Sequence, residues 1–485
     1  MKSAQNIQLP ELLAPAGGFE QLRYALYFGA DAIYLACDKF GLRQRAQNFS
    51  LEDMPRAVQM AHDVNVKVYV TLNAYLHDDD LADLPAYLQS LEASGVDAVI
   101  VSDLGVLAAA QQHAPSVDIH VSTQASVSNV AAARMWHELG AKRIVVAREM
   151  SLAEIAALKR ELPEVELEVF VQGAMCMAIS GRCLISDFLT GRSANQGHCV
   201  QPCRWNYRLE EETRPGEYFP IEEDANGTYL MNSKDLNMLA HVDDLIAAGV
   251  DSIKIEGRVK KAFYVATVVN AYRHVLDGED PKQWEAELDR ISHRPYSTGF
   301  FYGDAQQSFD DDVYVQHYDW VAEVVESRSL SQVNSALSPQ VKSEANPQAD
   351  PAFDSEANPE LNLQADLVSS LGLNQQTNTH SIPRSASIAG EVSTKDNKWY
   401  TIVHCRNRFY EGDVLELLSP HRKVMSISVT GLEEVFLAEE SHTIVNRVSV
   451  EVANKAMGTY AFITPMPLHR YDILRVKRRD VSRKN

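Results

Sequence analysis

Apolar and polar positions repeat in a regular order through the first part of the chain: a short apolar run, a polar turn and an amphipathic helix, about every 30 residues. The apolar runs are rich in β-branched residues, which predicts buried strands, and the segments between them have the periodicity of helices. The predicted strands are Glu11–Ala16, Ala32–Cys37, Lys67–Leu72, Ala98–Ser102, Asp118–Ser122, Arg143–Ala147, Glu166–Val171 and Ser252–Glu256. Helices are predicted between them, for example at Leu84–Ala93, Val130–Leu139, Leu152–Leu162, Asp235–Ala248 and Ala262–Leu276.

Eight such units in roughly 270 residues predict an α/β fold, a closed (β/α)8 TIM-like barrel formed by residues 1–310. Glycines close several helices just before the next strand, at Gly95, Gly140 and Gly249, as expected at a helix C-terminus. A doubly wound sheet is the alternative. The turn at residues 15–19, however, lacks the glycine spacing of a dinucleotide-binding site.

A second pattern begins after the barrel. Residues 327–387 are rich in Ser, Asn, Gln, Ala and Pro and repeat the motif SEANP, which predicts a disordered insertion. Short alternating strands and turns follow it, and they predict a small β-barrel domain built from residues 319–326 and 388–470. The predicted strands after the insertion are Trp399–His404, Asp413–Leu418, Lys423–Val429, Arg447–Val452 and Gly458–Thr464.

Charge and hydropathy narrow the choice of partners. The formal net charge of −21 argues against indiscriminate binding of nucleic acids. The basic tail at residues 471–485 is a local exception and a candidate RNA contact, with a frayed terminus as the alternative. The N-terminal residues lack the apolar core of a signal peptide, and no apolar run of about 18 residues occurs. We therefore expect a cytoplasmic protein without a membrane partner.

Four of the six cysteines are concentrated in one glycine-containing loop that follows the seventh predicted strand, at residues 174–210. Cys176, Cys183, Cys199 and Cys203 have the spacing C-x6-C-x15-C-x3-C. Thiolates bind soft metals tightly when several converge, so the loop predicts a shared metal centre. Buried structural thiols and a disulfide are the alternatives to a metal. The spacing matches neither the paired knuckles of structural zinc nor the runs of ferredoxins, and it leaves zinc and iron–sulfur both open.

Polar residues at the C-terminal ends of barrel strands are candidates for a site, because barrel enzymes carry their chemistry there. Lys254, Glu256 and Arg258 form the densest group, and alternation along a strand places Lys254 and Glu256 on one side. Cations there could bind a carboxylate-bearing small molecule. The predicted substrate-binding residues are Arg43, Arg148, Lys254 and Arg258, and the catalytic candidates are His120 and Glu256. Further polar strand-end candidates are Asn73, Asp103, Thr123, Gln124, Glu149 and Gln172.

Purely structural roles compete with these functional ones. Glu256 could simply pair with Lys254 or Arg258, and a lone histidine such as His120 is more often a packing residue than an acid–base group. The arginines of the segment after the second strand, including Arg43, could equally form surface salt bridges.

Two motifs in the cysteine loop resemble a known family. Glu168-x-Phe170-x-x-Gly173-Ala174-Met175-Cys176 and Gly181-x-Cys183-x-Ile185-Ser186 are similar to the signature of the peptidase U32 (collagenase-like) family. The similarity extends through most of residues 8–310 and again through 395–470, although Gln172 stands where many members have His. The resemblance implies that the four cysteines hold a [4Fe-4S] cluster.

Members of this family include tRNA and rRNA hydroxylation proteins. One barrel followed by one small β domain is most similar to the tRNA-hydroxylating members. That resemblance implies prephenate-dependent formation of 5-hydroxyuridine at wobble position 34 of tRNA, the first step towards 5-carboxymethoxyuridine. In this hypothesis Arg148, Lys254 and Arg258 hold the carboxylates of prephenate. The macromolecular partners are tRNA and an electron-donor protein.

Two other classes of function stay open. The family's older label implies a peptidase, but neither an H-E-x-x-H nor a G-x-S-x-G motif occurs in the sequence. The third class is a non-catalytic iron–sulfur partner protein whose cluster is structural.

Overall fold

A computed structural model describes residues 9–43, 46–175, 180, 182–202, 234–303, 316–331, 333, 398–438 and 443–478, with four two-residue strands between 209 and 228. The chain divides into two compact units, Met1–His317 and Tyr318–Asn485. Among the helices described, none combines the length and the apolar composition that a bilayer crossing requires.

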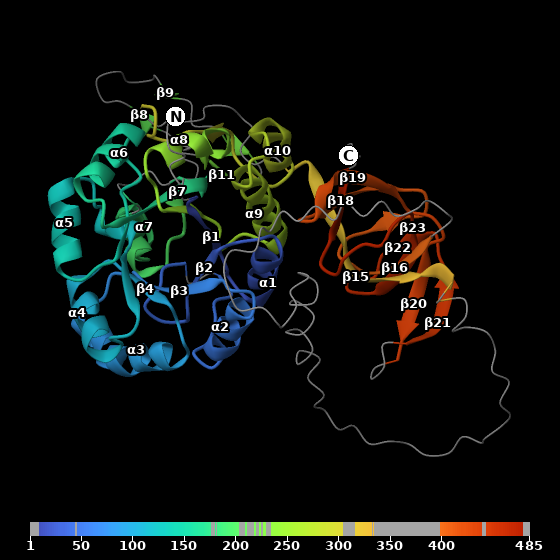
Figure 1. Ribbon diagram of the computed structural model, residues 1–485, viewed down its shortest axis with the longest axis horizontal. Helices are drawn as coiled ribbons and strands as arrows, with labels where there is room; N and C mark the ends of the chain where they lie inside the picture. Colours follow the sequence, from blue (N-terminus) through green and yellow to red (C-terminus); the bar gives the residue numbers. More distant parts are fainter. Residues whose placement is uncertain are drawn as a thin grey trace, which may run out of the picture. The chain divides into compact units, whose positions relative to one another are not determined.

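The first unit is a closed barrel of parallel strands, as predicted (Figure 1). Its strands are β1 (Glu11–Pro15), β2 (Ala32–Leu35), β3 (Lys67–Leu72), β4 (Ala98–Val101), β5 (Asp118–Val121), β6 (Arg143–Val145), β7 (Glu166–Ala174) and β13 (Ser252–Ile255). They pair in the order β13–β1–β2–β3–β4–β5–β6–β7, and β7 pairs with β13 to close the ring.

Helices surround the ring of strands on the outside (Figure 1). They are α1 (Phe19–Tyr27), α2 (Met54–His62), α3 (Leu84–Ala93), α4 (Leu104–His113), α5 (Val130–Glu138), α6 (Leu152–Glu161), α8 (Val242–Ala247) and α9 (Ala262–Leu276). Strands β2, β4, β6 and β13 are buried at every position, because both their faces are covered. This explains why the sequence shows continuous apolar runs rather than strict alternation.

One predicted helix is wrong over part of its length. Instead of a single helix at Asp235–Ala248, the structure has the strand β12 (Asp235–Asn237), a 3₁₀ helix (Leu239–His241) and the shorter α8. β12 pairs antiparallel with the end of β7, and β14 (Tyr296–Ser297) pairs with β12. The buried Arg294 holds Asp235 there, with Nη2 2.7 Å from Oδ1. Pairing with a distant strand therefore overrides the local helical pattern.

The second unit is an antiparallel β domain, as predicted. Its sheet consists of β15 (Tyr318–Ser329), β16 (Trp399–Cys405), β18 (Val414–Ser419), β19 (Arg422–Ser428), β20 (Glu433–Leu437), β21 (Ile444–Ser449), β23 (Thr459–Thr464) and β24 (Ile473–Lys477). The order is β19–β18–β24–β15–β16–β23–β20–β21, and one face covers a core that includes Val321, Val403, Phe409, Phe462 and Leu474.

The first and last strands of this domain reach into two segments with separate sequence-based predictions, the predicted insertion and the predicted basic tail. β15 pairs with β16 and β24 and continues to Ser329, and residues 334–397, which hold most of the predicted insertion, lie outside the described residues. β24 takes part of the predicted basic tail into the sheet, where Arg475 is buried with its Nη2 3.1 Å from Glu416 Oε2. The tail from residue 479 onwards lies outside the described part.

Candidate active site at the mouth of the barrel

A pocket opens at the C-terminal ends of the barrel strands, where barrel enzymes place their chemistry. It contains about 490 Å³ of space, part of it open solvent. The four predicted substrate-binding cations all line it: Arg43, Arg148, Lys254 and Arg258. The predicted candidates Glu256, Asn73, Thr123 and Gln124 also line it. The structure thus brings together residues from several different strand ends.

Arg258 is a buried cation that makes no direct ion pair among the residues that the structure describes. It is 3% exposed, its Nη1 donates to Thr71 Oγ1 at 3.0 Å, and it forms no ion pair within the described residues. Burial, with a contribution from Arg43, lowers the pKa of Arg258 to about 10, so the guanidinium is still charged at neutral pH. Because burying an unpaired charge is costly, this arrangement favours an anionic ligand.

Two glycines allow the backbone to come close enough to build the pocket. A Cβ at Gly17 would lie 2.1 Å from the carbonyl oxygen of Arg258, so the turn after β1 reaches the end of β13 only without a side chain. Gly173 has a φ of +103°, and a Cβ there would lie 2.6 Å from the carbonyl oxygen of Glu256. These contacts fix the backbone from which Glu256 and Arg258 project.

Glu256 lies between two arginines. Its Oε1 is 3.7 Å from Arg43 Nε, and its Oε2 is 3.7 Å from Arg148 Nη2. Burial alone would raise the pKa of Glu256, but Arg43, Arg148 and Arg258 outweigh burial and hold the pKa below its ordinary value. Glu256 is therefore a carboxylate at neutral pH, suited to accept a proton or to orient guanidinium groups. The sequence left open an ion pair of Glu256 with Lys254 or Arg258. The structure instead places Glu256 in ion pairs with Arg43 and Arg148.

Lys254 is tied to the interior of the barrel. Its Nζ donates to Glu168 Oε1 at 2.7 Å, and the two side chains are 4% and 0% exposed. The ammonium lies 4.4 Å from the ring centroid of Tyr34 and 5.4 Å from that of Phe170. Because Glu168 balances its charge, Lys254 shapes the floor of the pocket while adding little to its net charge.

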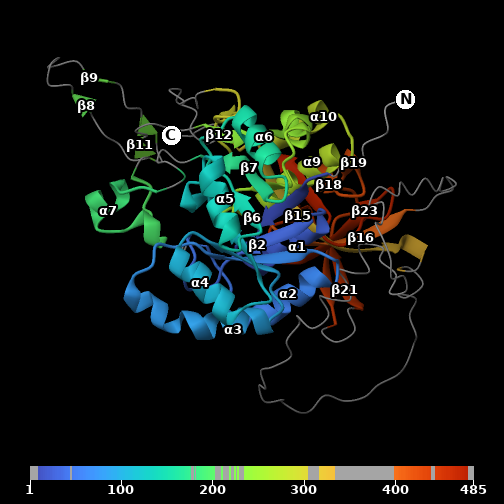
Figure 2. The same ribbon diagram turned by 60° about the vertical axis from the view of Figure 1, so that its left-hand side comes forward.

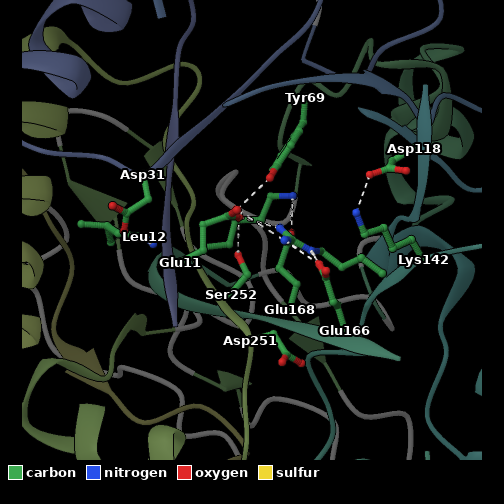
Figure 3. Close-up of polar contacts among 12 residues, drawn as sticks. Glu11, Leu12, Asp31, Tyr69, Asp118, Lys142, Glu166, Glu168, Asp251 and Ser252 are labelled. Atoms are coloured by element: carbon green, nitrogen blue, oxygen red, sulfur yellow. Dashed lines mark hydrogen bonds and ion pairs between the residues drawn. The ribbon is translucent and has the colours of Figure 1, made fainter. Parts of the chain in front are cut away.

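Glu168 connects the floor of the pocket to a buried ion network at the other end of the barrel. Its Oε2 lies 3.3 Å from Arg143 Nη1, and Arg143 also donates to Glu11 at 2.6 Å and to Glu166 at 2.8 Å. The Tyr69 hydroxyl donates to Glu11 at 2.7 Å. Figure 3 shows Glu11, Tyr69, Glu166 and Glu168 converging inside the barrel. The buried charges below the pocket are thus paired with one another.

His120 lies inside the barrel and does not line the mouth pocket. It is 2% exposed, and its ring packs edge-on against Tyr69 with the ring centroids 4.7 Å apart. Burial, followed by the charges of Arg143 and Lys254, holds the pKa of His120 well below its ordinary value, so the ring is neutral. Among the described residues its Nδ1 has no hydrogen-bond partner. This placement matches the packing interpretation.

Three further candidates make contacts that hold the structure together. Asp103 accepts the backbone N–H groups of the first turn of α4 and caps that helix. Gln172 is 1% exposed and accepts a hydrogen bond from the Tyr272 hydroxyl at 3.2 Å. Glu149 accepts from Ser180 N at 2.6 Å and from Ser180 Oγ at 2.8 Å, which fastens the cysteine loop to the barrel.

Two of the four predicted metal ligands lie in the described part of the loop. Cys183 and Cys199 are free, half-buried thiols, and the backbone N–H of Gln201 donates to Cys199 Sγ at 3.3 Å. Sulfur atoms that ligate a metal or a cluster commonly accept hydrogen bonds of this kind. Cys176 and Cys203 lie outside the described residues. Among the residues described, no group of three or more His, Cys, Asp or Glu could hold a metal ion, and those two cysteines are not among them.

The residues of the site that were not predicted from the sequence include Tyr34, Thr71 and Glu168. The sequence could have indicated Glu168, because a carboxylate within an apolar strand needs a buried cation as its partner. Tyr34 and Thr71 carried no such signal, since aromatic and β-branched residues are ordinary in strands.

The chain belongs to Peptidase family U32. Residues 17–311 match that family, and residues 384–475 match the Peptidase family U32 C-terminal domain.

Relatives within the family bear different names. The tRNA hydroxylation protein P1 of Bacillus subtilis is 39% identical over 327 residues, covering 65% of this chain and 77% of the relative. A 23S rRNA 5-hydroxycytidine synthase of Escherichia coli is 40% identical over 267 residues, covering 55% of this chain and 39% of the relative. A protein named Collagenase from Porphyromonas gingivalis is 30% identical over 317 residues, covering 61% and 75%.

The buried pair under the pocket can be tested by Glu168→Gln. The variant leaves Lys254 buried without a carboxylate, so we expect it to lower the free energy of unfolding by about 3 kcal/mol, measured by urea denaturation. Glu166→Gln is the matched control, because Glu166 also contacts Arg143 but its side chain is 32% exposed. We expect it to cost less than about 1 kcal/mol. Adding Lys254→Met to Glu168→Gln should recover part of the loss. Equal effects of the two single variants would refute the pairing.

Proposed function

We propose that this protein is an oxygen-independent, tRNA-modifying hydroxylase of the cytoplasm. It uses prephenate to form 5-hydroxyuridine at wobble position 34, the first step towards 5-carboxymethoxyuridine. The observation that carries the proposal is the buried guanidinium of Arg258 at the mouth of the barrel, which has no ion-pair partner in the described part of the chain. The relatives named for tRNA hydroxylation and for rRNA 5-hydroxycytidine synthesis support hydroxylation of an RNA pyrimidine as the class of reaction.

The charge of the pocket suits a ligand with two carboxylates. Four cations and the carboxylate of Glu256 line it, and Glu168 compensates Lys254 from below. Counting these groups leaves a net charge of about +2, and prephenate carries two carboxylates at neutral pH. Arg258 and Arg148 present guanidinium groups, which match carboxylates in shape and hydrogen-bonding capacity.

In this proposal the residues of the pocket have different roles. Arg43, Arg148 and Arg258 bind the carboxylates of prephenate. Glu256, held as a carboxylate between Arg43 and Arg148, is placed to accept a proton and to keep both arginines oriented. Lys254 supports the aromatic walls of the pocket from below.

The polar side of the pocket is suited to a uracil base. Asn73 Nδ2 donates to Ser122 Oγ at 3.0 Å, and Gln124 and Thr123 lie beside them. Amide and hydroxyl groups can both donate to and accept from the Watson–Crick edge of uridine. A wobble base is already unpaired in its loop, which lowers the cost of presenting it to a pocket.

The cysteine loop is the proposed place of a [4Fe-4S] cluster. Cys176, Cys183, Cys199 and Cys203 would ligate it. The free thiols of Cys183 and Cys199 and the N–H donor to Cys199 are compatible with that role. A bound cluster would supply electron transfer. Glu149 keeps the loop beside the pocket through Ser180.

A hydrolase is the second candidate, because one relative is named Collagenase. The two candidates differ in what happens to protein substrates. Cleavage of gelatin or casein by the purified protein would favour the hydrolase. If neither protein is cleaved and tRNA is hydroxylated, the hydroxylase is favoured.

The proposed reaction can be tested by mass spectrometry of tRNA nucleosides. In cells that lack this gene and any oxygen-dependent enzyme making the same product, 5-oxyuridine derivatives should disappear, and the wild-type gene should restore them. Arg258→Met should restore less than about a tenth, because it removes the buried guanidinium. Arg160→Met, an exposed arginine on α6, is the matched control and should restore the full amount. Unchanged nucleosides in the deletion strain would contradict the proposal.

The cluster can be tested separately through bound iron. Anaerobically purified wild-type protein should contain iron and show the broad visible absorbance of thiolate-bound iron. Cys183→Ser and Cys199→Ser should each lose most of both signals. Cys405→Ala is the control, because Cys405 is buried in the second unit, far along the chain from the loop. Full iron content in the two serine variants, or bound zinc in place of iron in the wild-type protein, would rule the cluster out.

A further inference from the structure

The short helix α7 (Ile185–Thr190) in the cysteine loop exposes large apolar side chains. Phe188 is 88% exposed and Leu184 71%, while Leu189 and Ile185 are 44% and 37% exposed. Leu184 and Phe188 are four residues apart, as are Ile185 and Leu189, so the four lie on neighbouring rows of one helix face. A cluster of this kind is unusual on a protein surface and marks a binding surface.

The opposite face of α7 is anchored, which fixes the direction of the exposed face. Ser186 is fully buried, its hydroxyl donates to Arg192 O at 2.7 Å, and it accepts the N–H of Val200 at 3.2 Å. The Thr190 hydroxyl donates to Ser186 O at 2.6 Å. Figure 2 shows α7 standing away from the ring of barrel helices. Phe188 is therefore held outward by the fold of its own loop.

This surface is connected to the rim of the mouth pocket. Asn73 lines the pocket, and two residues further along the chain Tyr75 is 61% exposed. The backbone N–H of Tyr75 donates to Asn195 O at 2.8 Å, and Asn195 Oδ1 accepts the N–H of Cys183 at 3.2 Å. Two hydrogen bonds thus lead from the pocket rim to the loop that carries Phe188.

The charges around the apolar face suit a polyanion. Arg182 and Arg192 flank α7 on either side, and both are exposed. In the part of the chain that is described, neither takes part in an ion pair, and Asp187 is the acidic residue within the helix. In a protein with a net charge of −21, two accessible arginines beside exposed aromatic rings form a local basic surface.

We propose that Tyr75, Phe188 and the flanking Arg182 and Arg192 form a platform for the unpaired nucleotides next to the base that enters the pocket. The inference rests on the proposed function and specifies how the RNA is held. Unpaired bases would stack on the two exposed rings, and the guanidinium groups would contact phosphates. Aromatic stacking together with cationic contacts is the usual basis of single-stranded RNA recognition.

The platform can be tested by measuring the affinity of the full-length protein for a tRNA anticodon stem-loop, using fluorescence anisotropy. Because stacking of one base contributes about 1–3 kcal/mol, Phe188→Ala and Tyr75→Ala should each weaken binding by about fivefold to 150-fold. Phe188→Trp should keep the affinity, since it preserves a stacking surface. Phe436→Ala is the matched control, because Phe436 is an exposed phenylalanine of the second unit, 43% exposed, and should leave affinity unchanged.

Further measurements separate this inference from the proposed function. Arg192→Met should lower the slope of RNA affinity against salt concentration by the amount expected for about one phosphate contact. Phe188→Ala should leave the affinity for prephenate, measured by calorimetry, unchanged. If the wild-type protein hydroxylates tRNA while both alanine variants bind the stem-loop as tightly as wild type, the platform is refuted and the proposed function stands. Unchanged RNA affinity with slower electron delivery would assign the surface to a protein partner and equally refute the platform. Wild-type protein that neither binds nor modifies tRNA would contradict the proposed function itself.

Discussion

The arrangement at the mouth of the barrel depends on an imbalance of buried charge. Inside the barrel, Arg143 and Lys254 are paired with Glu11, Glu166 and Glu168, so each of these charges has a partner of opposite sign. Arg258, which is as buried as these two cations, has a threonine hydroxyl as its described hydrogen-bond partner. A folded protein retains such a group at a cost in stability, because the desolvated guanidinium makes no direct ion pair among the described residues. This arrangement supports the proposal that the mouth of the barrel binds an anion.

The closed ring of strands makes this possible. Parallel strands place their carboxyl ends on one rim, so residues distant in sequence converge there. Backbone packing sets the finer geometry, since Gly17 and Gly173 let neighbouring turns approach the carbonyl groups of Arg258 and Glu256. The ion network beneath is equally non-local and fixes Lys254 under the aromatic rings of the pocket. Rigidity of this kind positions guanidinium groups before the ligand binds, which favours both affinity and selectivity.

The sequence was sufficient for the barrel and for the identity of the pocket's cations. Buried parallel strands leave continuous apolar runs, and their helices end at glycines, so each unit carries a local signal. Pairings across the barrel carry no such signal: Lys254 and Glu168 are 86 residues apart, and Arg258 and Thr71 are 187 apart. The sequence therefore suggested Lys254 as a ligand-binding cation, whereas in the structure Lys254 forms an ion pair with Glu168. For the same reason β12 was predicted as helix, because its strand character comes from β7 and from Arg294.

The net charge of the pocket is the quantity on which the functional proposal depends, and ligand valence tests it most directly. Isothermal titration calorimetry would compare prephenate with phenylpyruvate, an analogue of similar size that carries one carboxylate. A pocket with two uncompensated positive charges should bind prephenate at least about tenfold more tightly, with the difference shrinking as salt is added. Equal affinities for the two compounds, or no binding of prephenate, would contradict the assignment of this pocket to a dianion.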